Sequence, residues 1–292
     1  MNAGRKAGVP WQSAARSTAQ RLGLDPRYLR RARWLHKARA VQRSGHSISR
    51  HWRLVLTSPE PDNYTYEIAN EYDLAVWAAA VIRCDVAVAW TIVREPHRDV
   101  VLTDRLQNAT AGHWFWTKRM PPFGKRLGWY ALVRALRPRL VIEVGAHDGL
   151  GSLLVLRALE LNEREGSRGE LVSFDVNAAA GWLVGAHPLW ELRIQSSHEG
   201  IAEVLSARGP LDMFIYDGWH THEAEYADLE AAAAYLSSEG VLISDDAQVS
   251  RALSHLCERV GFGYFEFQEA PVGHFYPGAV LGAGRPPACE IE

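Results

Sequence analysis

The chain has 292 residues, of which 47% are hydrophobic and 23% are charged. This composition is typical of a globular protein, and it excludes a disordered chain, a collagen-like repeat and a small disulfide-rich scaffold. The three cysteines are odd in number, lie far apart and form no C-x-x-C pair. This pattern favours a reducing compartment, the cytoplasm, over a structural zinc site or a dithiol centre.

Charge is distributed unevenly along the chain, although the net charge is only −2. Residues 1–53 carry 13 Lys and Arg against one acid, Asp25, whereas the remainder has 19 basic and 33 acidic residues. Asp25 and Pro26 are typical of a helix N-terminus, so the arm is predicted to be helical. We interpret it first as a cationic segment on an acidic surface or a partner subunit, and second as a contact for nucleic acid or an anionic membrane.

Residues 54–125 are predicted to be rich in helices and loops, with one helix at Glu71–Ile82. This region is expected to form a lid over an acceptor site or a homo-oligomer contact. The apolar run at 74–93 approaches the roughly 20 residues of a membrane span, but Arg83 and Asp85 lie at its centre. We therefore expect no transmembrane helix, and the N-terminus lacks the apolar core of a secretory signal.

After Arg139 the pattern changes to short apolar strands that alternate with helices. The predicted strands are Leu140–Gly145, Leu171–Val176, Leu189–Ile194, Met213–Asp217, Val241–Asp246 and Ala279–Gly282, and the predicted helices are Leu150–Leu161 and Glu223–Leu236. This alternation predicts an α/β fold: a doubly wound, mostly parallel sheet with helices on both faces. In such sheets ligands bind in the crevice at the carboxyl ends of the strands.

A glycine-rich turn follows the first of these strands, with the pattern Glu143-x-Gly145-x-x-x-Gly149-x-Gly151. Such glycines let the backbone approach a ligand before a helix begins. Because residues 146–148 occupy the loop, the spacing is not G-x-G-x-x-G, and a pyrophosphate-bearing cofactor is disfavoured. The next strand ends at Asp175, a carboxylate placed to accept the hydroxyls of a ribose. Turn and acid together favour a cofactor that contains adenosine but no phosphates.

With these motifs, residues from about 123 to 285 resemble the class I S-adenosylmethionine-dependent methyltransferases. The resemblance implies a seven-stranded Rossmann-like methyltransferase domain at 126–292, preceded by the basic arm at 1–53 and the helical region at 54–125. It implies that Glu143 and the turn face the methionine part of the cofactor, Asp175 the ribose, and residues 196–198 the adenine. The implied cofactor contacts are Glu143, Gly145, Ala146, His147, Asp148, Gly149, Ser152, Asp175, Val176, Ser196, Ser197 and Asp217.

Three carboxylates follow two further strands: Asp217 after one, and Asp245 with Asp246 after the next. Adjacent strand ends lie about 5 Å apart, so these acids can converge, and a divalent cation would relieve their repulsion. Mg²⁺ is favoured, and Mn²⁺ accepts the same oxygen ligands. This half of the chain resembles metal-dependent O-methyltransferases of the macrolide-sugar type, in which Asp217, Asp245 and Asp246 match the metal ligands and His220 the general base.

The resemblance implies O-methylation of a hydroxyl on a small molecule, a sugar or another product of secondary metabolism. A histidine suits the role of base because it can be neutral at pH 7 and accept the proton. Three alternatives remain: a metal-independent methyltransferase with structural acids, a nucleic-acid methyltransferase whose basic arm tracks phosphates, and a binding protein that has lost catalysis. The acidic body and the absence of an N-P-P-Y-type sequence argue against the nucleic-acid alternative.

Overall fold

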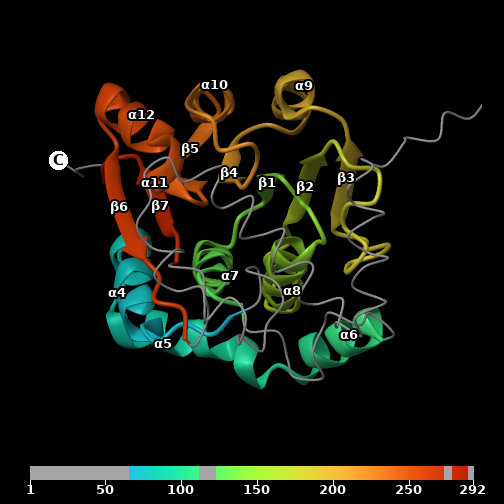
Figure 1. Ribbon diagram of the computed structural model, residues 1–292. Coiled ribbons are helices and arrows are strands. Elements are labelled where there is room, and N and C mark those ends of the chain that lie inside the picture. The colour runs from blue at the N-terminus through green and yellow to red at the C-terminus, as the bar shows by residue number, and fades with distance from the viewer. Residues whose placement is uncertain (1–65, 112–122, 273–277, 289–292) are drawn as a thin grey trace, which may run out of the picture. The chain divides into compact units, whose positions relative to one another are not determined.

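The structure is a computed structural model that describes residues 66–111, 123–272 and 278–288. The chain divides into two compact units, 1–66 with 271–277, and 67–270 with 278–292. All helices and strands labelled in Figure 1 belong to the second unit. The predicted basic arm at 1–53 lies outside the described residues, and the predicted domain boundaries stay predictions.

Within the described residues, seven strands form one sheet in the order β3-β2-β1-β4-β5-β7-β6 (Figure 1). The strands are β1 (Leu140–Val144), β2 (Glu170–Asp175), β3 (Trp190–Ile194), β4 (Leu211–Tyr216), β5 (Leu236–Ser244), β6 (Gly263–Gln268) and β7 (Val280–Arg285). Strands β1 to β5 are parallel to one another, and β7 runs antiparallel between β5 and β6. The predicted mostly parallel seven-stranded sheet is confirmed.

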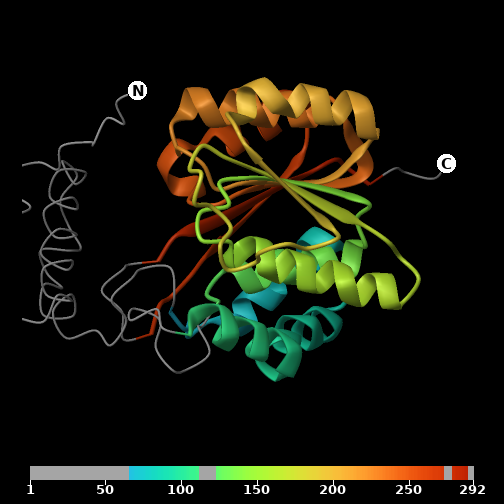
Figure 2. The same ribbon diagram turned by 90° about the vertical axis from the view of Figure 1, so that its right-hand side faces the viewer.

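Helices cover both faces of the sheet, as Figure 2 shows. One layer holds α4 (Glu71–Ile82), α5 (Val86–Arg94), the 3-10 turn η1 (Glu95–Arg98), α6 (Val100–Thr110), α7 (Arg126–Leu136) and α8 (Leu150–Arg164). The other holds α9 (Ser197–Arg208), α10 (His222–Ala233) and α12 (Ala252–Val260), and the single turn α11 (Ala247–Ser250) joins β5 to α12. This double covering explains why all five residues of β1 are buried and four of them are apolar.

The strand order reverses beside β1, since β2 and β3 extend the sheet on one side and β4 and β5 on the other. At such a switch point the connections from neighbouring strands leave in opposite directions and open a crevice at the carboxyl ends. The chain leaves β1 through the glycine turn and leaves β4 through Asp217. The fold therefore brings the two predicted site segments to the same edge of the sheet.

The apolar run at 74–93 forms two short helices, α4 and α5. Arg83 follows α4 with a left-handed φ of 66°, and its N–H donates to the carbonyl of Ala79. The chain turns there and restarts as a helix at Val86. No helix of the described residues is long and apolar enough to cross a membrane.

The predicted boundary between α10 and β5 was wrong: the helix expected to run to Leu236 ends at Ala233, and the strand expected to begin at Val241 begins at Leu236. Leu236 is instead the first residue of β5, where it pairs with Leu211 of β4. The apolar spacing could not separate a last helical turn from a strand start, because the chain passes from α10 into β5 within two residues.

Candidate active site

Gly145 lies where β1 and β4 end side by side, and its φ of 94° is in the left-handed region. A Cβ at this position would lie 2.0 Å from the carbonyl oxygen of Asp217. The Asp217 N–H donates to the carbonyl of Val144 at 2.8 Å, so the two strand ends are joined there. The first glycine of the turn is thus required by the approach of the β4 end as well as suited to a ligand.

Asp175 holds the glycine turn from the end of β2. The N–H of His147 donates to Asp175 Oδ2 at 2.8 Å, and the N–H of Asn177 donates to Oδ1 at 2.8 Å. Each carboxylate oxygen can accept a further bond, and Asp175 is half-buried at the edge of the sheet. The predicted ribose acid therefore also fixes the loop that would lie over the cofactor.

The second part of the turn is bound to the segment that follows β2. Asp148 Oδ1 accepts a 2.8 Å hydrogen bond from Nε1 of Trp182, and the carbonyl of His147 accepts the Gly181 N–H at 2.7 Å. Gly149, with φ of 94°, precedes α8, and Ala146 is buried. These contacts fix the path of the backbone, so Asp148 acts on the loop rather than pointing openly into the crevice.

Glu143 is almost fully buried near the end of β1, with 1% of its surface exposed. Its Oε2 accepts hydrogen bonds from Ser152 Oγ at 2.6 Å and Ser173 Oγ at 2.5 Å. Burial raises the pKa of Glu143 to about 7 against the opposing effect of the two serine hydroxyls, and the charge of Asp217 adds to the rise. Within the described residues no hydrogen bond is made to Oε1, which leaves that oxygen for a ligand.

Three further predicted cofactor contacts lie at the ends of β2 and β3, and two of them, Ser196 and Ser197, belong to the segment predicted near the adenine. Val176 is 62% exposed just after β2. Ser196 precedes α9, and the Ser197 hydroxyl donates to Asp228 Oδ2 of α10 at 2.6 Å. Ser197 therefore ties α9 to α10, and Ser196 and Val176 are the better placed of the three to meet a ligand.

His220 lies against two of the predicted carboxylates. Its Nε2 is 3.5 Å from Asp217 Oδ1 and 3.6 Å from Asp246 Oδ2. The backbone at His220 has φ of 50°, and the ring meets that of Tyr216 edge-on at 6.4 Å between centroids. The buried Nδ1 has no hydrogen-bond partner among the residues that the structure describes.

The pKa of His220 is raised to about 9. Burial alone would lower it, but the hydrogen bond to Asp217 and the charges of Asp217, Asp246 and Asp245 outweigh the burial. The field of three nearby carboxylates therefore favours the protonated imidazole, an effect that the sequence-based expectation of a neutral His220 at pH 7 did not include.

Two cations that the sequence analysis missed complete this group of side chains. Lys125 Nζ lies 2.9 Å from Asp245 Oδ2 and 3.1 Å from Asp246 Oδ1, and the Lys125 side chain is 3% exposed. Arg126 Nη2 lies 3.6 Å from Asp217 Oδ2. A signal was available, since a Lys-Arg pair stands at the start of the buried helix that leads into the glycine-turn strand. We refer to Lys125, Arg126, Asp217, His220, Asp245 and Asp246 as the charged cluster.

The predicted metal ligands do not form a metal-binding group. Within the described residues, no set of three or more His, Cys, Asp or Glu side chains is arranged to hold a metal ion. Mg²⁺ needs oxygen ligands at about 2.0–2.1 Å in octahedral geometry. Instead the Lys125 ammonium occupies the space between Asp245 and Asp246, and burial together with Asp217 raises the pKa of Asp245. The donor set as it stands therefore does not fit a divalent cation.

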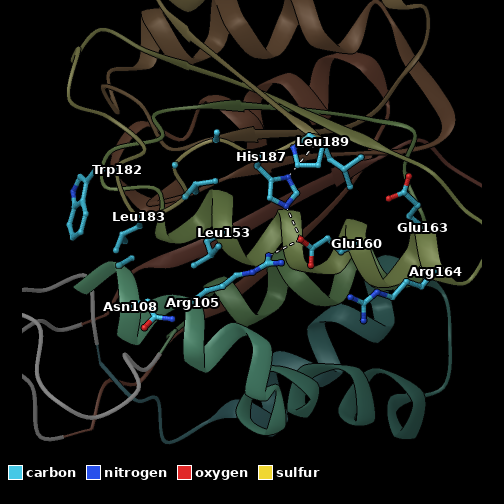
Figure 3. Close-up of a pocket in the computed structure, with 15 residues that line it drawn as sticks. Arg105, Asn108, Leu153, Glu160, Glu163, Arg164, Trp182, Leu183, His187 and Leu189 are labelled. Atoms are coloured by element: carbon cyan, nitrogen blue, oxygen red, sulfur yellow. Dashed lines mark hydrogen bonds and ion pairs between the residues drawn. The ribbon is translucent and has the colours of Figure 1, made fainter. Parts of the chain in front are cut away.

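A pocket of about 690 Å³ lies elsewhere, between α6, α8 and the segment before β3 (Figure 3). Glu160 lies at its centre, 2.7 Å from both Arg105 Nη1 and His187 Nε2. These charges already satisfy one another. The pocket contains none of the predicted site residues.

Residues 142–247 match the family model of a methyltransferase domain. This range contains the glycine turn, Asp175, Asp217 and the Asp245–Asp246 pair, on the strand order and reversed β7 described above. The chain therefore contains a methyltransferase domain over this range. The matched range covers about a third of the chain and includes neither Lys125 nor Arg126 of the charged cluster.

Several solved structures are similar to this chain at low sequence identity. The chain is similar to an O-methyltransferase from Bacillus cereus in complex with SAH (16% identity, 64% of this chain and 91% of that one, TM-score 0.48). It is also similar to the O-methyltransferase TomG from Streptomyces achromogenes in complex with SAM (19% identity, 65% of this chain and 91% of that one, TM-score 0.46). A third similar structure is an rRNA methylase from Streptococcus thermophilus (15% identity, 54% of this chain and 93% of that one, TM-score 0.40). No curated protein matches the sequence. Similarities at this level do not identify the acceptor.

Proposed function

We propose that this protein is an S-adenosylmethionine-dependent methyltransferase that transfers a methyl group to a hydroxyl oxygen of a small molecule, with His220 as the general base. The observation that carries the proposal is the position of His220 Nε2, held within 3.6 Å of Asp217 and Asp246 at the end of β4. The same strand end touches the glycine turn through Gly145. A cofactor on the turn and an acceptor at His220 would therefore be neighbours.

The cofactor-binding half of the proposal rests on the ends of β1 and β2. Asp175 would accept hydrogen bonds from the ribose hydroxyls, because each of its oxygens can accept a second hydrogen bond. Glu143 Oε1 would accept a hydrogen bond from the ammonium of the methionine part, and the positive charge of this ammonium would stabilise the ionised form of the buried carboxyl. Ser196 and Val176 would border the adenine.

The chemistry needs a positioned acceptor and a proton acceptor, because the cofactor's sulfonium supplies both the methyl group and a neutral thioether leaving group. His220 Nε2 takes the hydroxyl proton while the oxygen forms its bond to the methyl carbon. The imidazolium that results is stabilised by Asp217 and Asp246. Before reaction His220 must be in its neutral form, so turnover requires loss of a proton from a group with a pKa of about 9.

The acceptor class, a sugar or another product of secondary metabolism, is carried by the resemblance of the Asp217-to-Asp246 half of the chain to small-molecule O-methyltransferases. The same resemblance implied Mg²⁺ or Mn²⁺, but no step here uses a metal, because Lys125 lies where the ion would bind. A lid or a homo-oligomer contact formed by the N-terminal region, and a location in the cytoplasm, also stay proposals.

Calorimetric titration of the full chain with S-adenosylhomocysteine tests the cofactor half, and transfer of a labelled methyl group to a panel of hydroxylated small molecules tests the acceptor half. We expect micromolar binding, and turnover that His220→Asn abolishes while binding stays within a few fold. Absence of binding would contradict the proposal. Binding with labelling of RNA alone would favour a nucleic-acid methyltransferase, and binding without any turnover would favour a non-catalytic protein.

A further inference from the structure

We propose that the ammonium of Lys125 takes the place of a divalent cation in the charged cluster, so that the site holds its carboxylates together without a metal ion. The inference depends on the proposed function in one respect, namely that the acceptor binds at this cluster. It concerns the ion-binding chemistry of the cluster itself, which can be measured with neither cofactor nor acceptor present.

The first argument is geometric. Lys125 Nζ bridges one oxygen of each acid, 2.9 Å from Asp245 Oδ2 and 3.1 Å from Asp246 Oδ1. These are charge-assisted hydrogen-bond distances, and an ion bound between the same oxygens would have to displace the ammonium. The Lys125 and Asp245 side chains are each 3% exposed, so the displaced ammonium would lose its partners inside the protein.

The second argument is charge balance. In the described part of the chain, two side chains that are always cationic at neutral pH lie against the three carboxylates of the cluster: Lys125 against Asp245 and Asp246, and Arg126 against Asp217. The repulsion that made a divalent cation the simplest expectation is thus relieved by the protein's own cations. Adding a doubly charged ion would leave this cluster with excess positive charge.

The third argument is that both the backbone and the ammonium of Lys125 are held by contacts with other residues. Its N–H donates to Oε2 of the buried Glu269 at 3.1 Å, and Glu269 Oε1 accepts the N–H of Ala279 at 2.9 Å. Lys125 also directly precedes α7, and its carbonyl accepts the Gly128 N–H at 2.8 Å. The side chain therefore projects from a backbone tied to both the end of β6 and the first turn of α7.

Binding of Mn²⁺, followed by loss of the free-ion signal in electron paramagnetic resonance, tests the proposal on the full chain. We expect no saturable binding by the wild type up to about 1 mM, a weak-site limit for a hard cation. Lys125→Met removes the ammonium but keeps its length, and we expect it to gain a site at least tenfold tighter. That gain should disappear in the double variant Lys125→Met with Asp246→Asn.

Two controls separate this effect from general ones. Lys125→Arg keeps a cation and should gain no site. Arg134→Met removes a cation that bonds Glu95 and Glu165 on the helical layer, and it too should gain none. A gain in Arg134→Met would show that any uncovered acid pair collects Mn²⁺, and the result for Lys125→Met would then not support the proposal.

The proposal is overturned if the wild type binds Mn²⁺ below about 1 mM and Asp246→Asn removes that binding, because Lys125 would then give way to the ion. It is also overturned if a folded Lys125→Met gains no site. If Lys125→Met does not fold, the wild-type titration decides. Since S-adenosylhomocysteine is absent throughout, failure here leaves the cofactor measurement intact, and failure of cofactor binding leaves the Mn²⁺ result intact.

Discussion

The ammonium nitrogen of Lys125 lies 2.9 Å from Oδ2 of Asp245, and each of these two side chains is 3% exposed. They are separated by 119 residues in sequence and join the start of α7 to the end of β5. A buried pair of this kind is costly to break on one side only, by about 3–5 kcal/mol, because the other charge stays buried. The contact therefore holds the start of α7 against the end of β5 within the charged cluster.

Gly145→Ala is expected to be strongly destabilising. The new Cβ would meet the Asp217 carbonyl oxygen at 2.0 Å, a backbone atom that cannot rotate away, and the φ of 94° adds strain. We expect a loss of at least about 3 kcal/mol in the free energy of unfolding, measured by urea denaturation.

The matched control for Gly145→Ala is Gly166→Ala. Gly166 has nearly the same φ, 91°, but a Cβ there would have nothing within 4 Å. Its cost should be only that of the left-handed backbone, about 1–2 kcal/mol. Equal losses in the two variants would show that close approach to the Asp217 carbonyl contributes nothing.

Much of the sheet could be predicted from the sequence, because parallel strands that are covered by helices on both faces consist mainly of consecutive apolar residues. Val141, Ile142 and Phe214 lie in such runs, and each is fully buried. β6 was not predicted. It is an edge strand in which only Phe267 is buried, so Gly263–Gln268 lacks the apolar run that marked the inner strands.

The carboxylates of the site could be predicted because each follows an apolar strand, and strand ends converge at one edge of the sheet. Lys125 could not be placed by that reasoning, since it precedes a helix and reaches the cluster through tertiary packing of α7. The protonation of His220 depends on distances to three acids. The spacing of Asp217 and His220 indicated one of these, and the other two needed the register of β5 beside β4.

The proposed role of His220 predicts a basic pH optimum. Because only the neutral imidazole accepts a proton, kcat/KM should rise tenfold per pH unit below a pKa of about 9 and level off above it. A stopped assay across this range, with enzyme stability checked at each pH, would measure the profile. A plateau already reached at pH 7 would contradict either the raised pKa or the role as base.

The same pKa predicts how stability changes with pH. The folded pKa of His220 lies above the model value of 6.5, so its protonation stabilises the folded state fully below about pH 6.5, and this stabilisation is lost as pH rises through about 9. Wild-type protein should therefore lose more unfolding free energy between pH 6.5 and 9 than His220→Gln, whose side chain does not titrate. Parallel losses in urea denaturation would show that the histidine is not charged in the folded state.

Glu143 predicts a pH-dependent affinity for the cofactor. Its pKa of about 7 means that a large fraction is protonated near neutral pH, whereas a ligand ammonium needs the ionised carboxylate. We expect the affinity for S-adenosylhomocysteine to rise severalfold from pH 6 to pH 8 in calorimetric titrations. Glu143→Gln should bind more weakly with a flat profile, and a flat profile in the wild type would place the ammonium elsewhere.

Asp175→Asn separates a ribose contact from a structural one. Both oxygens of Asp175 accept backbone N–H groups, so the amide must lose one of these bonds as well as a ligand contact. Asp212→Asn is the matched control, because Asp212 Oδ2 accepts the Arg139 N–H at 2.8 Å at the opposite ends of the strands. We expect both variants to lose about 1–2 kcal/mol of stability, and only Asp175→Asn to lose tenfold or more in affinity for S-adenosylhomocysteine. If both retain affinity, Asp175 serves the loop alone, and the ribose must be bound by another residue at this edge of the sheet.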